Sequence, residues 1–184
     1  MLKGIDVSSY QPAALSTNGL SFAFVKATEG TDYVNPKQAA QSQSARGSGL
    51  VVGFYHFLRP GDVQTQAQCF VERCLSLPND ILACDWEAEG GTAPTCAEKD
   101  QFLAAVKQLR PNHRIVLYCD VDFWHNRDST SNCGDGLWIA DYSHPAGQPA
   151  VQHQWLFHQY SQAPVDQSVA NFETAGQLRQ WAGQ

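Results

Sequence analysis

Short apolar runs separated by turn-forming residues constrain the fold of this chain more than any other feature. The runs are rich in Val, Ile, Phe and Tyr, a composition that predicts β-strands. Most lack clean polar alternation, which is typical of parallel strands that are covered on both faces. Eight such strands in a chain of 184 residues predict one closed barrel. The predicted strands are residues 4–8, 22–27, 51–57, 81–86, 115–119, 137–141, 156–160 and 165–169.

Helices fit between the early strands and are scarce in the later connections. Capping residues at Asn35, Asp62 and Thr95 predict helices that end near residues 47, 77 and 109. Prolines stop the last two of these helices. After the fifth strand, the connections are rich in Gly, Pro, Asn and Ser and have little helical periodicity, until a short closing helix over 173–181. We therefore expect βαβ units in the first half of the barrel and a second half with few helices.

The charge pattern disfavours two classes of partner. The formal net charge is −6, and Lys and Arg are scattered without a basic run, so the electrostatic footprint of nucleic-acid binding is missing. No apolar stretch approaches the roughly 20 residues that a membrane-spanning helix needs. We expect a monomer with no nucleic-acid and no membrane partner.

Six cysteines leave two possibilities open. None of their spacings forms a C-x₂-C metal pair, so a zinc site is disfavoured. Cys69 and Cys74 lie five apart on a predicted helix and point to different faces, which argues against pairing them. A disulfide is best placed between Cys119 and Cys133, where it would close a short loop, and the alternative is a set of buried free thiols.

The fourth strand ends in two carboxylates. In α/β barrels the active site lies where the strands end and the following loops begin. The run that ends in Asp85-Trp86-Glu87 is otherwise apolar. Strand periodicity places Asp85 and Glu87 on one face, with Cys84 and Trp86 on the other.

Two more acids belong to strands that must be neighbours. Asp6 interrupts the first strand, and Asp166 opens the eighth. If the barrel closes, the fourth strand lies across the lumen from them, so these acids ring one pocket with Asp85 and Glu87. Crowding raises the pKa of at least one carboxyl toward neutrality, as a general acid requires. The alternative is that Asp6 and Asp166 cap turns and that Asp85 pairs with Lys26.

A series of motifs occurs along nearly the whole chain in a specific order and spacing. The motifs are Gly4-Ile5-Asp6-Val7-Ser8 with Tyr10-Gln11, Phe24-Val25-Lys26-Ala27-Thr28-Glu29-Gly30, Gly53-Phe54-Tyr55-His56-Phe57, Asp85-Trp86-Glu87, Leu117-Tyr118, Leu137-Trp138-Ile139-Ala140 with Tyr142, and Gln159-Tyr160-Ser161. Together they resemble glycoside hydrolase family 25, the Chalaropsis-type lysozymes. The resemblance implies an α/β fold, a TIM-like barrel of eight strands with about five helices in a (β/α)5(β)3 arrangement. This agrees with the helix-poor second half.

The resemblance also implies an enzyme, a lysozyme-type glycoside hydrolase. It implies a muramidase that cleaves the β-1,4 bond between N-acetylmuramic acid and N-acetylglucosamine in peptidoglycan. By the same resemblance Glu87 is the general acid, Asp85 is its partner, and Asp6 and Asp166 complete the acidic cluster. Asp85 either attacks the anomeric carbon or orients the substrate's own N-acetyl group as the nucleophile. A D-x-E strand end also resembles the substrate-assisted chitinases, which favours the second route.

Sugar rings present apolar faces that pack against aromatic side chains. The candidates near strand ends are Tyr55, Tyr118, Trp138, Tyr142 and Tyr160. Aromatic residues in strands serve as packing residues at least as often, so each has both interpretations. Lys26 is a further candidate that either holds an acidic neighbour ionised or forms an ordinary salt bridge. His56 is interpreted as a wall residue and not as a catalyst.

These residues bear on two rival functions and leave several settings open. A carbohydrate-binding barrel that has lost catalysis would lack the D-x-E pair, and a metal-dependent hydrolase would use the acids as ligands of a divalent ion. We expect no metal and no cofactor. We expect one catalytic domain over residues 1–184 without a wall-binding module, acting on the cell wall or in the periplasm, outside the cytoplasmic membrane. With no signal peptide in this numbering, the protein would be a phage endolysin, a delivered antibacterial toxin with a cognate inhibitor, or a trimmed secreted enzyme.

Overall fold

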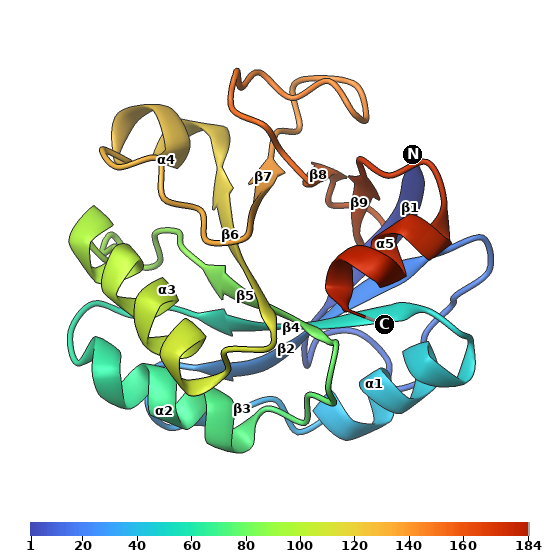
Figure 1. The fold of residues 1–184 in the computed structure, drawn as a ribbon, viewed down its shortest axis with the longest axis horizontal. Coiled ribbons are helices and arrows are strands. Elements are labelled where there is room, and N and C mark those ends of the chain that lie inside the picture. Colours follow the sequence, from blue (N-terminus) through green and yellow to red (C-terminus); the bar gives the residue numbers. More distant parts are fainter. Residues whose placement is uncertain (184) are drawn as a thin grey trace.

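Eight strands close into a barrel, and five helices surround it unevenly (Figure 1). The computed structural model describes residues 1–183. Its strands are β1 (Leu2–Val7), β2 (Phe22–Glu29), β3 (Tyr33–Val34), β4 (Val51–Phe57), β5 (Ile81–Asp85), β6 (Arg114–Asp120), β7 (Gly136–Ala140), β8 (Phe157–Ser161) and β9 (Asp166–Ala170). Its helices are α1 (Gln38–Gly47), α2 (Val63–Arg73), α3 (Cys96–Leu109), α4 (Val121–Asn126) and α5 (Ala175–Ala182). The expected barrel of eight strands with five helices is confirmed.

The barrel closes through one strand that runs antiparallel to both of its neighbours. Strands β1, β2, β4, β5, β6, β7 and β8 run parallel in this order around the barrel. The last strand, β9, fills the gap between β8 and β1 and is antiparallel to both. The two-residue strand β3, which the sequence did not predict, pairs only with the end of β2. Because β9 runs backward, its first residue lies at the end of the barrel where the parallel strands finish.

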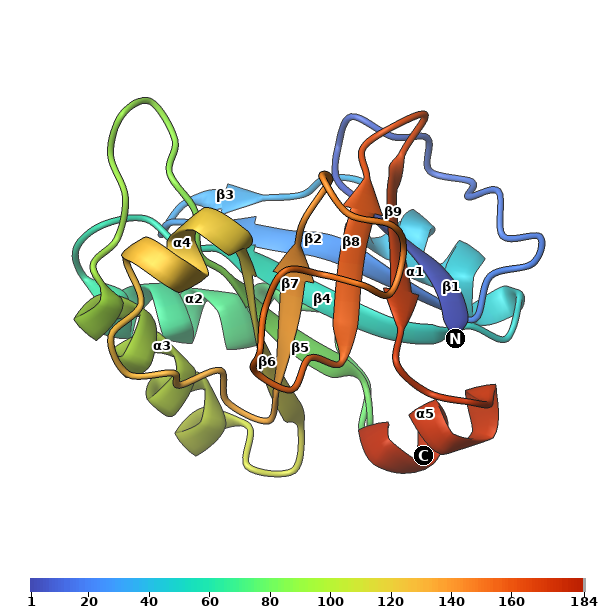
Figure 2. The ribbon, with the colours of Figure 1, turned by 90° about the horizontal axis from the view of Figure 1, so that it is seen from above.

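Helices cover one side of the barrel and leave the other to loops. Figures 1 and 2 show α1, α2 and α3 along the side formed by β2, β4 and β5, whereas β7, β8 and β9 are flanked mainly by loops. The predicted helix-poor second half is therefore correct, although it contains the short helix α4. No helix within residues 1–183 has the length and apolar character needed to cross a membrane.

Two helix ends differ from the sequence prediction, the first of them for a tertiary reason. The helix after Asp62 ends at Arg73, not near residue 77. The Gln38 side chain of α1 accepts a hydrogen bond from the Leu75 N–H and donates one to the Arg73 carbonyl, and so satisfies the helix end from outside. At α1 itself, the helix begins at Gln38, and the Asn35 side chain accepts a hydrogen bond from the Lys37 N–H just before it.

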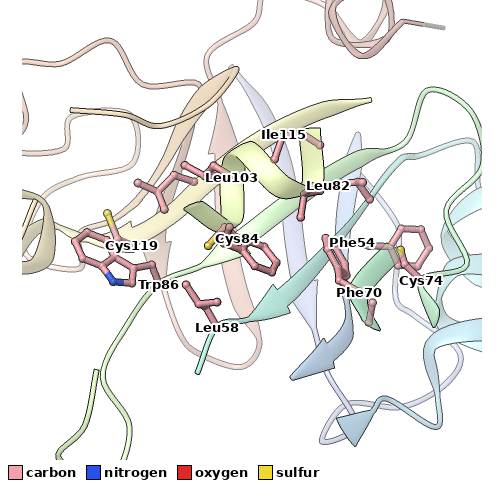
Figure 3. Packing of buried hydrophobic residues seen from close by; sticks show 14 of the residues in the cluster. Phe54, Leu58, Phe70, Cys74, Leu82, Cys84, Trp86, Leu103, Ile115 and Cys119 are labelled. Carbon is pink, nitrogen blue, oxygen red and sulfur yellow. The ribbon is translucent and has the colours of Figure 1, made fainter. Parts of the chain in front are cut away.

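The core has an inner and an outer layer. Inside the barrel, Phe24 stacks on Trp138 with ring centroids 4.3 Å apart. A Cβ atom at Gly53 would lie 2.3 Å from the Phe24 ring, so the neighbouring strand needs glycine at this position. Outside the barrel, apolar side chains of the strands pack against α2 and α3, as Figure 3 shows for Leu82, Trp86 and Leu103.

All six cysteines are free thiols, so the disulfide considered between Cys119 and Cys133 is not formed. Cys119 is fully buried in the outer apolar layer, in the same cluster as Trp86 (Figure 3). The Cys133 Sγ lies 3.5 Å from the Nε2 atom of His153 instead. Burial raises the pKa of the Cys119 thiol well above its usual value, which keeps it in the protonated form. The alternative of buried free thiols is the one that this structure contains.

Candidate active site

A polar cavity of about 290 Å³ opens at the end of the barrel where the parallel strands finish. It is lined by Asp6, Tyr55, Asp85, Glu87, Tyr118, Asp120, Trp138, Tyr142, Gln159, Gln162 and Asp166. Every strand of the closed barrel except β2 therefore contributes a side chain from itself or from the loop that follows it. The four acids singled out in the sequence lie together in this cavity.

Asp85 and Glu87 enter the cavity because residues two apart on a strand share a face. Asp85 is the last residue of β5 and is 6% exposed. The side chains between and before them point the other way, since Cys84 and Trp86 belong to the outer apolar layer. The Trp86 indole donates a hydrogen bond to the Pro94 carbonyl at 2.9 Å, which fixes the chain between the two acids.

Asp6 and Asp166 reach the cavity through the strand pairing that closes the barrel. Asp6 is buried near the end of β1, and Asp166 is the first residue of β9. The two are direct partners in the antiparallel register. A parallel β9 would have carried Asp166 to the opposite end of the barrel.

Four carboxyl groups of the cavity, those of Asp6, Asp85, Glu87 and Asp166, have raised pKa values for related reasons. Burial is the largest cause for Asp85 and raises its pKa well above the usual range, and the charge of Glu87 adds to this effect. Burial also raises the pKa of Glu87, aided by the charges of Asp120 and Asp166 and opposed by a hydrogen bond with Asp85 and by the charge of Lys26. The pKa values of Asp6 and Asp166 are raised by burial as well. The cavity thus retains protons at a pH where isolated carboxyls have lost them.

A buried glutamine joins two tyrosines to Asp6. The Tyr118 hydroxyl donates to Gln159 Oε1 at 2.8 Å, and the Tyr142 hydroxyl donates to the same atom. With Oε1 occupied, the amide nitrogen faces Asp6 and donates to its Oδ2 at 2.8 Å. Burial raises the pKa of Tyr142 to about 12, so its hydroxyl stays protonated and able to donate. The hydrogen bonds of the amide oxygen and of the amide nitrogen together determine the orientation of the Gln159 side chain.

The aromatic candidates differ in exposure. Trp138 is buried, and its indole donates to the Ser168 hydroxyl at 3.1 Å, so it forms part of the floor. Tyr55 and Tyr118 pack edge-on against Trp138. Tyr142 follows β7 and is 44% exposed, which leaves its ring accessible at the cavity mouth.

Three residues considered in the sequence lie outside the cavity lining. Lys26 forms an ion pair with Glu29 at 2.5 Å and not with Asp85. The Tyr160 hydroxyl donates to Gln167 Oε1, on the opposite side of β8 from Gln159. His56 is buried between Thr28 and Gln66, and burial lowers its pKa to about 4, consistent with a neutral wall residue.

Sequence reasoning missed Asp120, Gln159 and Gln162. Asp120 follows Tyr118 by two residues, so strand periodicity would have placed both on one face. Gln159 alternates with Phe157, whose ring lies inside the barrel, and the same periodicity would have selected it in place of Tyr160. Gln162 lies in the loop after β8, where periodicity gives no signal.

Comparisons with known proteins relate this arrangement to one family. The sequence profile of Glycosyl hydrolases family 25 matches residues 5–169. The N,O-diacetylmuramidase of Chalaropsis sp is 30% identical over 155 residues, which cover 71% of this chain and 72% of that protein. The autolytic lysozyme of Clostridium acetobutylicum is 27% identical over 165 residues, covering 87% of this chain but only 50% of its own length. Among solved structures, the muramidase from Acremonium alcalophilum has a TM-score of 0.83 at 26% identity, and 99% of each chain is covered.

Proposed function

The chain belongs to glycosyl hydrolase family 25, and from this membership we propose that it is a muramidase that hydrolyses the glycan strands of peptidoglycan. The observation that carries the proposal is the pair Asp85 and Glu87, which share a polar cavity at the barrel mouth with raised pKa values. A glycosidase needs one protonated carboxyl beside the leaving oxygen and a second group that assists attack at the anomeric carbon. This pair provides both.

Glu87 is the general acid in this proposal. It lies nearer the mouth than Asp85, beyond the end of β5, where the glycosidic oxygen of a long glycan chain has access. Its raised pKa keeps a proton available near neutral pH, as a general acid requires. Once the bond is broken, the Glu87 carboxylate accepts a proton from the attacking water and is regenerated.

Asp85 assists the substrate's acetamido group. Its Oδ1 atom is buried and makes no hydrogen bond within the described residues 1–183. An acetamido N–H is a suitable donor to this oxygen, and the bond would direct the acetamido oxygen toward the anomeric carbon. A donor to Oδ1 also favours the ionised form of Asp85 and leaves the proton of the coupled pair to Glu87. Substrate binding would thereby make Asp85 the ionised partner and Glu87 the protonated acid.

The other lining residues bind the sugar. Tyr142 presents an accessible ring at the mouth, while Asp6 and Asp166 offer hydrogen-bond acceptors for hydroxyl or amide groups. Peptidoglycan lies outside the cytoplasmic membrane, so we propose that the protein acts there. If the protein is a delivered toxin, we propose that it also has a cognate inhibitor. A phage endolysin does not need one.

Mass spectrometry of peptidoglycan digests tests the proposal. A muramidase leaves muramic acid at the new reducing ends, and reducing-end glucosamine would contradict the assigned bond. The Glu87→Gln variant, which keeps the shape of the side chain, should lose about 10²- to 10⁴-fold in rate. If it keeps more than about a tenth of the activity, Glu87 is not the acid.

Two controls separate the rival functions. A sugar-binding barrel without catalysis would retain glycan fragments and release no new reducing ends. A metal-dependent hydrolase would lose activity in a chelator, whereas the proposed enzyme should not.

A further inference from the structure

Asp120 lies beside Glu87 because of the pairing between β5 and β6. Asp85 is the register partner of Tyr118. The ladder continues one residue further, since the Trp86 N–H donates to the Tyr118 carbonyl at 2.9 Å. Two residues beyond Asp85 is Glu87, and two residues beyond Tyr118 is Asp120. Both residues consequently lie at the same level along the barrel axis, and both side chains line the cavity.

Asp120 also caps a helix, and this hydrogen bond fixes its position. It is the N-cap residue of α4, and its Oδ1 accepts a hydrogen bond from the Phe123 N–H at 2.7 Å. Phe123 packs edge-on against Trp86, with ring centroids 5.1 Å apart. The helix that Asp120 begins therefore packs against the residue between the two acids of the pair. Asp120 thus uses one oxygen to cap the helix while its side chain lines the cavity.

Charged and titratable groups on several elements interact electrostatically with Glu87. They are Asp6 on β1, Lys26 on β2, Tyr55 on β4, Asp85 on β5, Tyr118 and Asp120 on β6, and Asp166 on β9. Lys26 is the cation of this group, and it is paired with Glu29. After burial, the charge of Asp120 contributes more than that of Asp166 to the raised pKa of Glu87.

We propose that Asp120 is a positioning residue that acts through Glu87, holding the reactive proton on that carboxyl near neutral pH while it also caps α4. The inference rests on the proposed function of Glu87. Negative charge beside Glu87 disfavours its ionised form before the glycosidic bond breaks. After proton transfer, the same charge makes the Glu87 carboxylate a stronger base toward water. One neighbouring charge thus assists both halves of the reaction.

The test separates the charge of Asp120 from its capping role. Asn and Ser are good N-cap residues, so Asp120→Asn and Asp120→Ser remove the charge and keep the cap. Both variants should lose activity at high pH, with the upper limb of the pH–activity profile moved down by about 0.5 to 1 unit. Activity below the optimum should change little, and Asp120→Glu, which keeps the charge, should retain the wild-type upper limb.

Asp122→Asn is the matched control. Asp122 lies on the same helix and is exposed, and its Oδ1 accepts a hydrogen bond from Asn126 instead of facing the cavity. Removing this charge should leave the profile unchanged. Thermal melting of each variant shows whether the fold is preserved.

Each remaining outcome has a defined meaning. If both cap-retaining variants keep the wild-type upper limb while Glu87→Gln is inactive, the role of Asp120 is disproved and the proposed function stands. A uniform loss at every pH also disproves it, because charge tuning moves the limb. If Glu87→Gln stays active, the proposed function fails and this inference fails with it.

Discussion

Asp6 and Asp166 face each other directly across the antiparallel pairing of β1 and β9. Like charges at such positions destabilise strand pairing. Burial raises the pKa of Asp6 well above its usual range, and the charge of Asp166 raises it further. Gln159 acts in the opposite direction by donating a hydrogen bond to Asp6. The strand that closes the barrel therefore brings together two acids that pairing alone would keep apart.

Asp166→Asn should move the upper limb of the pH–activity profile to lower pH. The charge of Asp166 raises the pKa of Glu87, so its loss lets Glu87 release its proton at a lower pH. The shift should be smaller than that of Asp120→Asn, whose charge contributes more. Activity above neutrality is the quantity to measure, with the melting temperature as a check on the fold. A normal profile with normal activity would remove Asp166 from the site.

Asp85→Asn distinguishes the two routes open to the partner carboxyl. An amide cannot form a glycosyl ester, but it retains some ability to hold an acetamido group. We expect weak residual cleavage of N-acetylated glycan. The complementary substrate carries a 2-substituent that cannot attack the anomeric carbon. Full turnover of that analogue by the wild-type enzyme would contradict substrate assistance.

The same Asp85→Asn change should stabilise the protein at neutral pH. Burial raises the pKa of Asp85 in the folded state above its unfolded value, so the folded state binds the proton more tightly. Stability from this group is complete below the unfolded pKa of about 3.9 and is lost as the pH rises through the folded value. Asparagine does not titrate, so the variant does not lose this stability as the pH rises. Urea denaturation should show a higher free energy of unfolding for the variant than for wild type at pH 7. At pH 3.5 the difference between the two should be near zero.

Gln159→Leu should lower both stability and activity. The change leaves the buried Tyr118 hydroxyl and Asp6 Oδ2 without their present partner, and each unsatisfied buried group costs about 1 to 3 kcal/mol. Gln162→Leu is the control, because Gln162 also lines the cavity but is exposed. Equal melting temperatures for the two variants would show that the Gln159 network contributes nothing.

Lys99→Met should destabilise the protein by about 3 to 5 kcal/mol. The Lys99 side chain is 0% exposed, and its ammonium binds Asp128 at 2.6 Å and the Asn132 carbonyl at 2.8 Å. Removing the cation leaves the Asp128 carboxylate, which is 3% exposed, without its charge partner. Lys107→Met removes a cation whose side chain is 43% exposed, and it should cost at most about 1 kcal/mol. Chemical denaturation that gave equal losses would refute the difference.

Much of the fold follows from local patterns. The eight barrel strands were predicted because their apolar runs end at turn residues, and the caps at Asp62 and Thr95 were found because their side chains accept helix N–H groups. The predicted end of α2 was wrong because the observed end is stabilised by hydrogen bonds with Gln38, which belongs to another helix. The helix α4 was missed because six residues carry too little periodicity to be recognised.

The site was predictable to the extent that it follows strand alternation. Asp85 and Glu87 were placed on one face by periodicity, and the structure brings both into the cavity. Gln159 was missed because its neighbour Tyr160 was chosen instead, and Asp120 because the predicted strand stopped at residue 119, one residue short of the observed end of β6. The ion pair of Lys26 with Glu29 depends on how the end of β2 turns, which the sequence pattern does not specify.

The backward course of β9 has a consequence for how the protein can be altered. Gln159, Gln162 and Asp166 all come from one hairpin, formed by β8, β9 and the short loop between them. Other lining residues are dispersed over strands that the whole barrel must hold in register. The loop between β8 and β9, by contrast, joins two strands at the same rim, so its length is not tied to the register of the barrel. A loop of another length would change the sugar contacts on one side of the site and leave Asp85 and Glu87 in place.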